Sequence, residues 1–224
     1  MTGYLRKVLA IVWKDVRAEL RTKDILSSML VFAGLSVLIF QFAFDLRADN
    51  VRLVLPGVLW IAVTFAGVLG LNRSFILEQD RGSLEGLFLA PVDRSAIYFG
   101  KLIGNLLFIF IVELLLLPLM TVLFNVSLLS PALLLVLALG TLGYAAVGTL
   151  FAALSINTRA REVMLPILLF PVMIPVFVAG VQAVGDLLDG GTLADIAKWL
   201  RLLVAYDAIF IAAAMLLFDY IVEE

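Results

Sequence analysis

The sequence contains no cysteine and no histidine among its 224 residues. Without cysteine the chain cannot form a disulfide, a thiolate nucleophile or an iron–sulfur cluster. Without histidine it has no imidazole ligand for haem or a metal ion and no imidazole base. Charged residues are also scarce, at 15%, against about 25% in an ordinary soluble domain. Because so much of the usual catalytic machinery is absent, we predict no catalytic residue and no metal site.

What the sequence has instead is apolar residues. They make up 63% of the chain, and the mean hydropathy is +1.13. A soluble fold of this size could not bury so much apolar surface and still cover itself with polar groups. The composition therefore excludes a water-soluble globular protein and predicts an all-α membrane protein that crosses the bilayer several times.

Apolar stretches of about 20 residues, the length that crosses roughly 30 Å of hydrocarbon, recur along the chain. The six predicted spans are residues 25–44, 53–72, 102–124, 131–155, 163–184 and 201–219. Ser130 and Pro131 form an N-cap and first-turn pair at the start of the fourth span. Asp93 is a further N-cap, for a helix that begins at Arg94 and runs into the third span. We expect one transmembrane domain over residues 1–224.

The residues before the first span, 4–23, show the periodicity of a helix. Apolar residues recur there at intervals of three and four: Leu5, Val8, Leu9, Val12, Val16 and Leu20. Basic residues occupy much of the remainder, and Trp13 suits the boundary between lipid and water. The pattern predicts an amphipathic helix lying in the membrane interface. The alternative is a helical leader surrounded by solvent.

The distribution of basic residues sets the orientation, because cytoplasmic segments are enriched in Lys and Arg. With the N-terminus in the cytoplasm, 12 of the 16 basic residues fall on the cytoplasmic side. The other 4 fall outside and are Arg47, Arg52, Lys198 and Arg201. We therefore expect both termini in the cytoplasm. On the outer side, Thr192 and Asp195 resemble a capping box, which predicts a short surface helix ending near Trp199.

The long cytoplasmic connection, residues 73–101, contains a second amphipathic pattern. Ser83 can cap a short helix, Glu85 falls in its first turn, where the helix dipole favours an acid, and Pro91 ends it. Its apolar face would be formed by Leu84, Leu87 and Phe88. Such a helix either docks into a groove on another protein or folds back onto the membrane surface of its own bundle, and the pattern leaves both open.

Two acidic residues, Glu113 and Asp207, lie within predicted spans rather than at their ends, and a charge there costs about 2.5–3.5 kcal/mol on insertion scales. Glu113 should therefore be protonated, paired or turned toward a polar interior. A hydrogen bond to Ser, Thr or Asn of a neighbouring span is the simpler interpretation, and a polar point in a substrate or conformational path is the alternative. Asp207 lies about a turn and a half from Arg201, near the outer boundary, so we expect it to pair with an Arg or Lys.

Proline and glycine interrupt several spans. The fifth span contains Pro166, Pro171 and Pro175. Each removes a backbone hydrogen bond and bends a helix, so this span holds either a fixed kink or a hinge. Small residues that permit close helix packing also recur: Gly100, Gly104, Gly140, Gly143 and Gly148.

Three stretches of the chain form a recognisable set. The first, in the long cytoplasmic connection, comprises Glu78, Asp80, Gly82, Ser83, Leu84, Glu85, Leu87, Leu89, Pro91 and Lys101. The others are residues 56–62, Pro-Gly-Val-Leu-Trp-Ile-Ala, and residues 169–176, with their paired prolines. They resemble the signature loop, the second span and the fifth span of the CcmB family, the haem exporter B permeases of cytochrome c maturation. The stretches occur in the expected order, and the resemblance covers essentially the whole chain.

This resemblance implies an ABC-2-type exporter-like permease in the bacterial inner (cytoplasmic) membrane. It implies a soluble ATP-binding-cassette ATPase (CcmA-like), a haem-handling membrane protein (CcmC-like), a small tether (CcmD-like) and a second copy of this chain as partners, with lipid around them and no nucleic acid. Haem would be the substrate of the complex. The ATPase-coupling helix would comprise Asp80, Gly82, Ser83, Leu84, Glu85, Leu87, Phe88, Leu89 and Pro91.

The sequence contains no nucleotide-binding loop, since its only Gly-Lys pair, Gly100 and Lys101, lacks the rest of the phosphate-binding motif. A partner must therefore bind any ATP that the complex uses, and we expect no cofactor on this chain alone. Two other functions remain open: a permease for lipid, polysaccharide or drug export, and a membrane scaffold without a transport path. An intramembrane redox enzyme is disfavoured by the absence of histidine and cysteine.

Overall fold

The computed structural model describes residues 2–44, 48–80, 86, 92–155 and 161–221. All the regular secondary structure in these ranges is helical. The helices are α1 (Thr2–Thr22), α2 (Asp24–Phe44), α3 (Ala48–Asp80), α5 (Arg94–Phe124), α6 (Pro131–Ser155), α7 (Arg161–Leu188) and α8 (Ala197–Ile221). All of them except α1 contain a segment that is long and apolar enough to cross a membrane. The predicted fold class, an all-α protein with six spans after an amphipathic helix, is confirmed.

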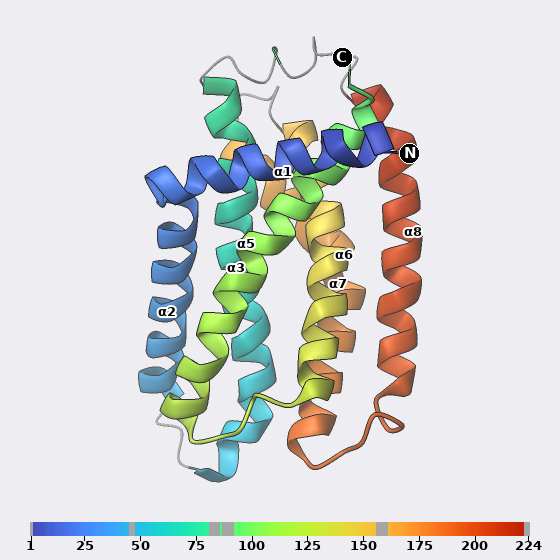
Figure 1. The fold of residues 1–224 in the computed structure, drawn as a ribbon. Coiled ribbons are helices and arrows are strands. Elements are labelled where there is room, and N and C mark those ends of the chain that lie inside the picture. Colours follow the sequence, from blue (N-terminus) through green and yellow to red (C-terminus); the bar gives the residue numbers. More distant parts are fainter. Residues whose placement is uncertain (1, 45–47, 81–85, 87–91, 156–160, 222–224) are drawn as a thin grey trace.

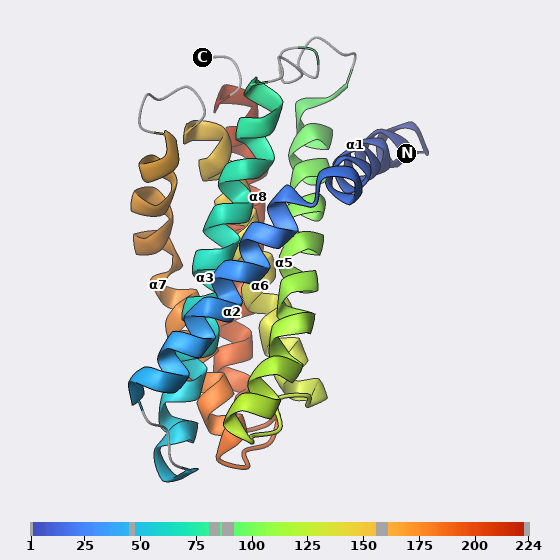
Figure 2. The same ribbon diagram turned by 90° about the vertical axis from the view of Figure 1, so that its left-hand side faces the viewer.

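The six long helices run side by side, and α1 lies across them near one end of the bundle, which we call the α1 end (Figure 1). In the view turned by 90°, α1 projects from the outer side of α5 (Figure 2). The helices α3, α6 and α8 end at the α1 end, and α2, α5 and α7 begin there. The end of α3 and the start of α5 therefore lie at the same end of the bundle as α1.

The corner between α1 and α2 is made by local backbone chemistry. Lys23 has a left-handed conformation, with φ of 57°, which ends α1 and lets the chain turn. Glu19, near the end of α1, then caps the start of α2, because its carboxylate accepts hydrogen bonds from the backbone N–H of Ile25 at 3.2 Å and of Leu26 at 2.8 Å. Both donors belong to the first turn of α2, whose N–H groups have no partner within the helix. The cap holds α1 at a fixed angle to α2.

The predicted helix ends agree best with the observed ones where a capping residue is present in the local sequence. The helix α6 spans Pro131–Ser155, as expected, and Ser130 caps it by accepting a hydrogen bond from the Leu133 N–H at 3.2 Å. The helix α5 begins at the predicted Arg94, although the side chain of the predicted N-cap, Asp93, makes no capping hydrogen bond. The helix α3 continues to Asp80, several residues past the expected end of its span. A charge can end an apolar stretch without ending the helix that carries it.

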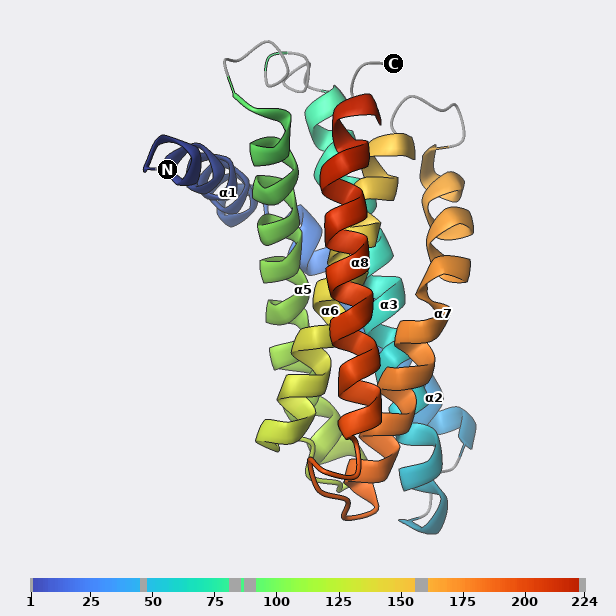
Figure 3. The same ribbon diagram turned by 90° about the vertical axis from the view of Figure 1, so that its right-hand side faces the viewer.

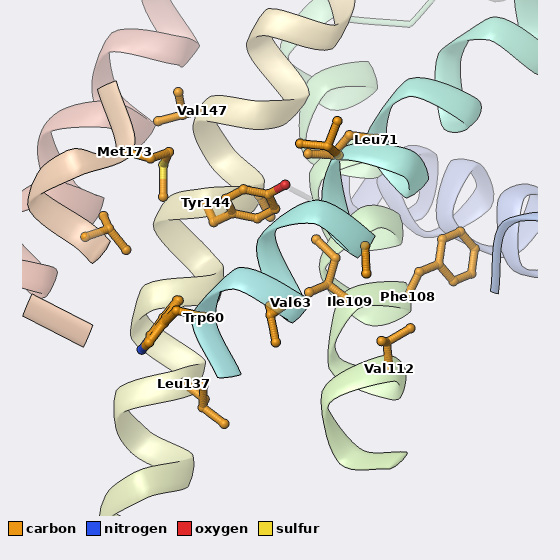
Figure 4. Packing of buried hydrophobic residues seen from close by; sticks show 14 of the residues in the cluster. Trp60, Val63, Leu71, Phe108, Ile109, Val112, Leu137, Tyr144, Val147 and Met173 are labelled. Atoms are coloured by element: carbon orange, nitrogen blue, oxygen red, sulfur yellow. The ribbon is translucent and has the colours of Figure 1, made fainter. Parts of the chain in front are cut away.

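The core lies around α6. In the apolar segment of this helix 72% is buried, compared with 22% in the apolar segments of α2 and of α8. Trp60 of α3 packs there with Leu137 and Tyr144 of α6 and with Met173 of α7 (Figure 4). The glycines of α6 leave room for these large side chains, as predicted. A Cβ atom at Gly140 would overlap the Trp60 indole.

The helix α7 changes direction about halfway along its length (Figure 3). Pro171 and Pro175 lie in this region and are exposed. A proline bend leaves carbonyl groups without their usual helical partners. Tyr206 of α8 donates a hydrogen bond to the Val172 carbonyl at 3.1 Å, so a neighbouring helix supplies a replacement donor within the bend.

The turn between α7 and α8 differs from its prediction. Residues 193–196 form turns rather than a short helix, and Trp199 lies within α8 itself. The expected interaction between Thr192 and Asp195 is present, because the Thr192 N–H and hydroxyl donate to Asp195 Oδ2 at 2.7 and 2.8 Å. These two hydrogen bonds lower the pKa of the Asp195 carboxyl below its ordinary value. Thr192 therefore caps a turn that leads directly into α8.

Candidate functional site at the α1 end

The connection between α3 and α5 is the main candidate site, and most of its predicted residues lie outside the described residues. These are Gly82, Ser83, Leu84, Glu85, Leu87, Phe88, Leu89 and Pro91. The two anchors of the connection are described: α3 ends at Asp80 and α5 begins at Arg94, both at the α1 end of the bundle, and α5 packs against α1 (Figures 1 and 2). A force applied to this connection would therefore act directly on α3 and α5.

The N-terminal turn of α5 also contacts the start of α1. Lys7 forms an ion pair with Asp93 at 4.0 Å, and the Tyr4 hydroxyl donates to the Ser95 hydroxyl at 3.2 Å. Both contacts are at least partly open to solvent, so each contributes little to stability on its own. They nevertheless place the first turns of α1 next to the C-terminal anchor of the connection.

A buried ion pair joins α1 to the bundle. Lys101 of α5, whose side chain is 1% exposed, lies 3.0 Å from Asp15 of α1, whose side chain is 11% exposed. The same ammonium donates to the Ser74 carbonyl of α3 at 3.2 Å and lies 5.3 Å from the centre of the Phe75 ring. One side chain therefore bonds to α1 and α3 from α5. A buried charge is tolerated only when it is paired in this way.

The approach of α1 to α5 depends on small residues in α5. A Cβ atom at Gly100 would overlap Ile11 of α1, and one at Gly104 would lie 3.6 Å from Asp15. The small residues predicted at these positions thus do permit close packing. Because the backbones are close, the short carboxylate of Asp15 can reach Lys101.

The apolar stripe predicted for α1 is divided between two environments. Val8 and Val12 are buried, with 4% and 8% exposure, and pack toward the bundle. Leu5, Leu9 and Leu20 are 58%, 62% and 64% exposed and face outward. Because α1 is packed along α5, a leader wholly surrounded by solvent is ruled out.

Glu113 faces the interior of the bundle, where it is 2% exposed. The Thr141 hydroxyl of α6 donates a hydrogen bond to its carboxyl group, which is the partner type expected from the sequence. Two turns nearer the α1 end, Asn105 of α5 donates to the Thr149 hydroxyl at 3.0 Å. With the Tyr98 hydroxyl, which donates to the Ala146 carbonyl at 3.1 Å, three hydrogen bonds from these two helices join α5 to α6.

The structure contradicts the pairing expected for Asp207. Its two carboxyl oxygens are buried and have no hydrogen-bond partner within the described part of the chain. The Arg201 Nε–H instead donates to the Ala197 carbonyl at 3.2 Å, because α8 continues through this region and holds Arg201 on an exposed face. Asp207 lies against Gly143 of α6, where an added Cβ would overlap it.

Asp207 is also deeper than predicted. It lies ten residues from the start of α8, as Thr141 does from the start of α6, and Glu113 lies eleven residues from the end of α5. Ten residues of helix span about 15 Å, which is half of a hydrocarbon core of about 30 Å. The two acids and Thr141 therefore occupy one level near the middle of the bundle.

The sequence reasoning missed the roles of Asp15, Glu19 and Lys101. A signal for the first two was present, because they are four residues apart and lie beside the apolar stripe of α1 rather than among its bases. An acid in that position needs a buried partner or a capping role. No local pattern identifies the partner, since Lys101 is far away in the sequence.

The bundle and its six long apolar helices together define a multi-span α-helical membrane protein. Within the described ranges, no group of three acidic side chains is placed to hold a metal ion, and the sequence has no His or Cys to add.

Comparison with known proteins identifies the family. The family described as "CcmB protein" matches residues 6–220, so the chain belongs to it. The heme exporter protein B of Pseudomonas aeruginosa is 28% identical over 193 residues, which is 86% of each chain. That of Rhodobacter capsulatus is 28% identical over 178 residues, 78% of this chain and 81% of the relative. That of Haemophilus influenzae is 26% identical over 212 residues, 92% of this chain and 96% of the relative.

Proposed function

We propose that this chain is the membrane permease subunit of an ATP-binding-cassette complex that serves haem export and haem-chaperone loading and release in cytochrome c biogenesis. The observation that carries the proposal is the family match over residues 6–220, together with relatives named heme exporter protein B that align over most of their length. A bundle of six apolar helices is the architecture that such a subunit requires.

The chain contributes movement and contact surface rather than chemistry. It has no nucleotide-binding loop and no His or Cys, so ATP binds to a separate ATPase subunit and other subunits ligate haem. The complex contains a CcmA-like ATPase, a CcmC-like haem-handling protein, a CcmD-like tether and two copies of this chain related by a two-fold axis.

The α1 end is the cytoplasmic face of the bundle in the inner membrane. Most of the basic residues of the chain belong to this end, including those of α1, as the positive-inside rule requires. Both termini then lie in the cytoplasm. The ATPase subunit meets the chain at the connection between α3 and α5, residues 81–93.

ATP-driven closure of the ATPase pushes on this connection. Because it is anchored on α3 and α5, the push moves both helices. Lys101 bonds α5 to Ser74 of α3 and to Asp15 of α1, so the three helices move as one unit. Hydrogen bonds between α5 and Thr141 and Thr149 of α6 pass the movement toward the centre of the bundle.

Two substitutions in the connection test this coupling. Glu85→Arg and Leu87→Asp should leave membrane insertion intact but abolish co-purification of the ATPase or uncouple its activity from cytochrome maturation. The matched controls are Asp189→Arg and Leu193→Asp, which change charge and polarity in the same way at the opposite end, where both residues are exposed. Normal ATPase assembly and normal maturation in both connection variants would refute the coupling role.

A second measurement tests the substrate. The complex is purified from its native host with its partners, and haem spectra are recorded with and without ATP. We expect haem in the complex and a change in its spectrum or release when ATP is added. A complex that contains an ATPase but no haem would indicate another exporter, and a haem complex indifferent to ATP would indicate a scaffold.

A further inference from the structure

The charges of α1 are sorted by sign in a way that the sequence does not reveal. The helix carries two acids and five bases. Both acids point into the protein, because Asp15 pairs with Lys101 and Glu19 caps the start of α2. Of the bases, the three arginines are exposed, as is Lys14, which also pairs with Asp15 at 3.3 Å, and the half-buried Lys7 pairs with Asp93. The surface that α1 presents to its surroundings is therefore strongly positive, although the helix as a whole is less so.

Two arginines dominate this surface. Arg17 and Arg21 are exposed, lie one helical turn apart, and have no carboxylate partner within the described ranges. Together with Trp13, one turn earlier, they line a shallow hollow of about 400 Å³. Its other lining residues are Ala10, Lys14 and Ala18. The small alanine side chains leave space between the longer ones.

An apolar row runs directly beside the basic one. Leu9, Trp13 and Leu20 are 62%, 63% and 64% exposed. These side chains belong to the edge of α1 between the face packed on α5 and the face that carries the arginines. A helix with such a pair of neighbouring rows needs an environment that is apolar on one side and negatively charged on the other.

The position of α1 matches the boundary of the hydrocarbon. It crosses the bundle (Figure 2) and packs on α5 at Gly100 and Gly104, where the long uncharged stretch of α5 begins. Residues of α5 and α3 continue beyond this level to the connection between them. With the uncharged stretch of α5 in the hydrocarbon, α1 lies at the level where hydrocarbon and headgroups meet.

We propose that the hollow formed by Trp13, Arg17 and Arg21 binds the headgroup of an anionic phospholipid in the leaflet at the α1 end. The two guanidinium groups supply hydrogen-bond donors in the planar arrangement that suits a phosphate. The indole of Trp13 lies against the glycerol region, and Leu9 and Leu20 lie against the acyl chains. Each base near an anionic membrane surface adds about a factor of five in affinity.

An acidic surface of a partner protein is the other class of ligand with the right charge. It would supply negative charge to Arg17 and Arg21 but would leave the adjacent apolar row, Leu9, Trp13 and Leu20, exposed to water. An anionic lipid supplies negative charge through its headgroup and an apolar environment through its acyl chains. The structure therefore favours the lipid, and protein binding becomes an outcome of the test.

The test measures which lipid lies next to Trp13 in the full chain. The protein is reconstituted in bilayers of equal parts phosphatidylcholine and phosphatidylglycerol, with bromine, a fluorescence quencher, on the chains of one lipid or the other. Subtracting the signal of Trp13→Phe isolates Trp13 from Trp60 and Trp199. We expect brominated phosphatidylglycerol to quench Trp13 roughly threefold more strongly than brominated phosphatidylcholine, and the difference to shrink at high salt.

Substitutions assign the effect to the two arginines. Arg17→Gln/Arg21→Gln should bring the quenching ratio close to one, whereas Arg17→Lys/Arg21→Lys should keep most of it. The matched control, Arg52→Gln/Arg201→Gln, removes the same charge at the opposite end and should leave the ratio unchanged. A ratio of one in the unsubstituted chain, or an undiminished ratio in Arg17→Gln/Arg21→Gln, would overturn the proposal. So would loss of the ATPase partner in that variant with no lipid preference in the parent, which would mark a protein-docking surface.

Discussion

At the scale of single residues, the few buried polar side chains mostly form hydrogen bonds or ion pairs between helices. Lys101 connects α5 to α1 and α3, and Glu113 accepts a hydrogen bond from α6. Tyr98 and Tyr144 each donate to a backbone carbonyl of a neighbouring helix, Ala146 and Thr64. In an apolar environment such contacts are specific, because a wrong helix position leaves a polar group without a partner.

The buried ion pair gives the first prediction. Lys101→Met removes the buried partner of the Asp15 carboxylate and leaves it only the half-exposed ammonium of Lys14, at 3.3 Å, so we expect the free energy of unfolding to fall by about 2 kcal/mol. Asp15→Leu/Lys101→Met removes both charges and should recover most of the loss. Unfolding of the full chain in detergent measures both. Lys198→Met, at an exposed position, is the control. A double variant as unstable as the single one would show that the pair is not the source of the effect.

The contact between Glu113 and Thr141 gives a second prediction. Glu113→Gln keeps an acceptor for the Thr141 hydroxyl and should preserve both stability and cytochrome maturation. Glu113→Leu and Thr141→Val should each cost about 1 kcal/mol, and the double variant should cost less than the sum, because each single change leaves one polar partner behind. Loss of maturation in Glu113→Gln, with normal stability, would instead assign Glu113 to a path through the membrane.

At the scale of elements, glycines determine how closely the helices pack, because a position without a side chain leaves room for a large side chain of the neighbouring helix. The indole of Trp60 in α3 fits between α6 and α7 because glycine occupies positions 140 and 180. At Gly34 and Gly57, by contrast, an added Cβ would meet no atom within 4 Å. The same residue type therefore has a packing role at two positions and none at the other two.

This difference is testable by alanine substitution. Gly140→Ala and Gly180→Ala force the Trp60 ring to move, and we expect each to lower the free energy of unfolding by about 1–3 kcal/mol. Gly34→Ala and Gly57→Ala should be neutral or stabilising, since alanine favours a helix over glycine. Thermal unfolding in detergent compares the four. Trp60→Leu should relieve part of the penalty of Gly180→Ala. Equal effects at all four positions would contradict this packing role.

At the scale of the whole molecule, the two ends of the described helix bundle differ. The α1 end holds the crossing helix, the end of α3, the start of α5 and most of the described basic residues, while the opposite end holds the turns that precede α6 and α8. This asymmetry is what the proposed orientation and the proposed lipid site share.

The absence of cysteine makes the orientation directly measurable. Single cysteines at Arg21 and Asp93, which are exposed at the α1 end, should react with a membrane-impermeant maleimide only after the cells are opened. Cysteines at Asp189 and Leu193, exposed at the opposite end, should react in intact spheroplasts. The reverse pattern would invert the proposed topology, and labelling of all four in intact spheroplasts would show that the two ends are not separated by a membrane.

Much of the fold follows from local patterns, and the reasons are specific. The bounds of α6 follow from the cap at Ser130 and from the length of its apolar stretch. The position of Glu113 in the interior follows from the cost of a charge in lipid. The expected partner of Asp207 was wrong, because closeness in sequence places Arg201 on the same helix but on an exposed face.

By itself the sequence determined the class of protein, the number of spans and their approximate ends, because these depend on the apolar length needed to cross a bilayer. Only the tertiary structure decided which polar groups meet. Asp15 reaches Lys101, and both acids of α1 turn inward while its arginines turn outward. These facts depend on how closely α1 approaches α5, and that distance is set by packing between segments far apart in the chain rather than by any local pattern.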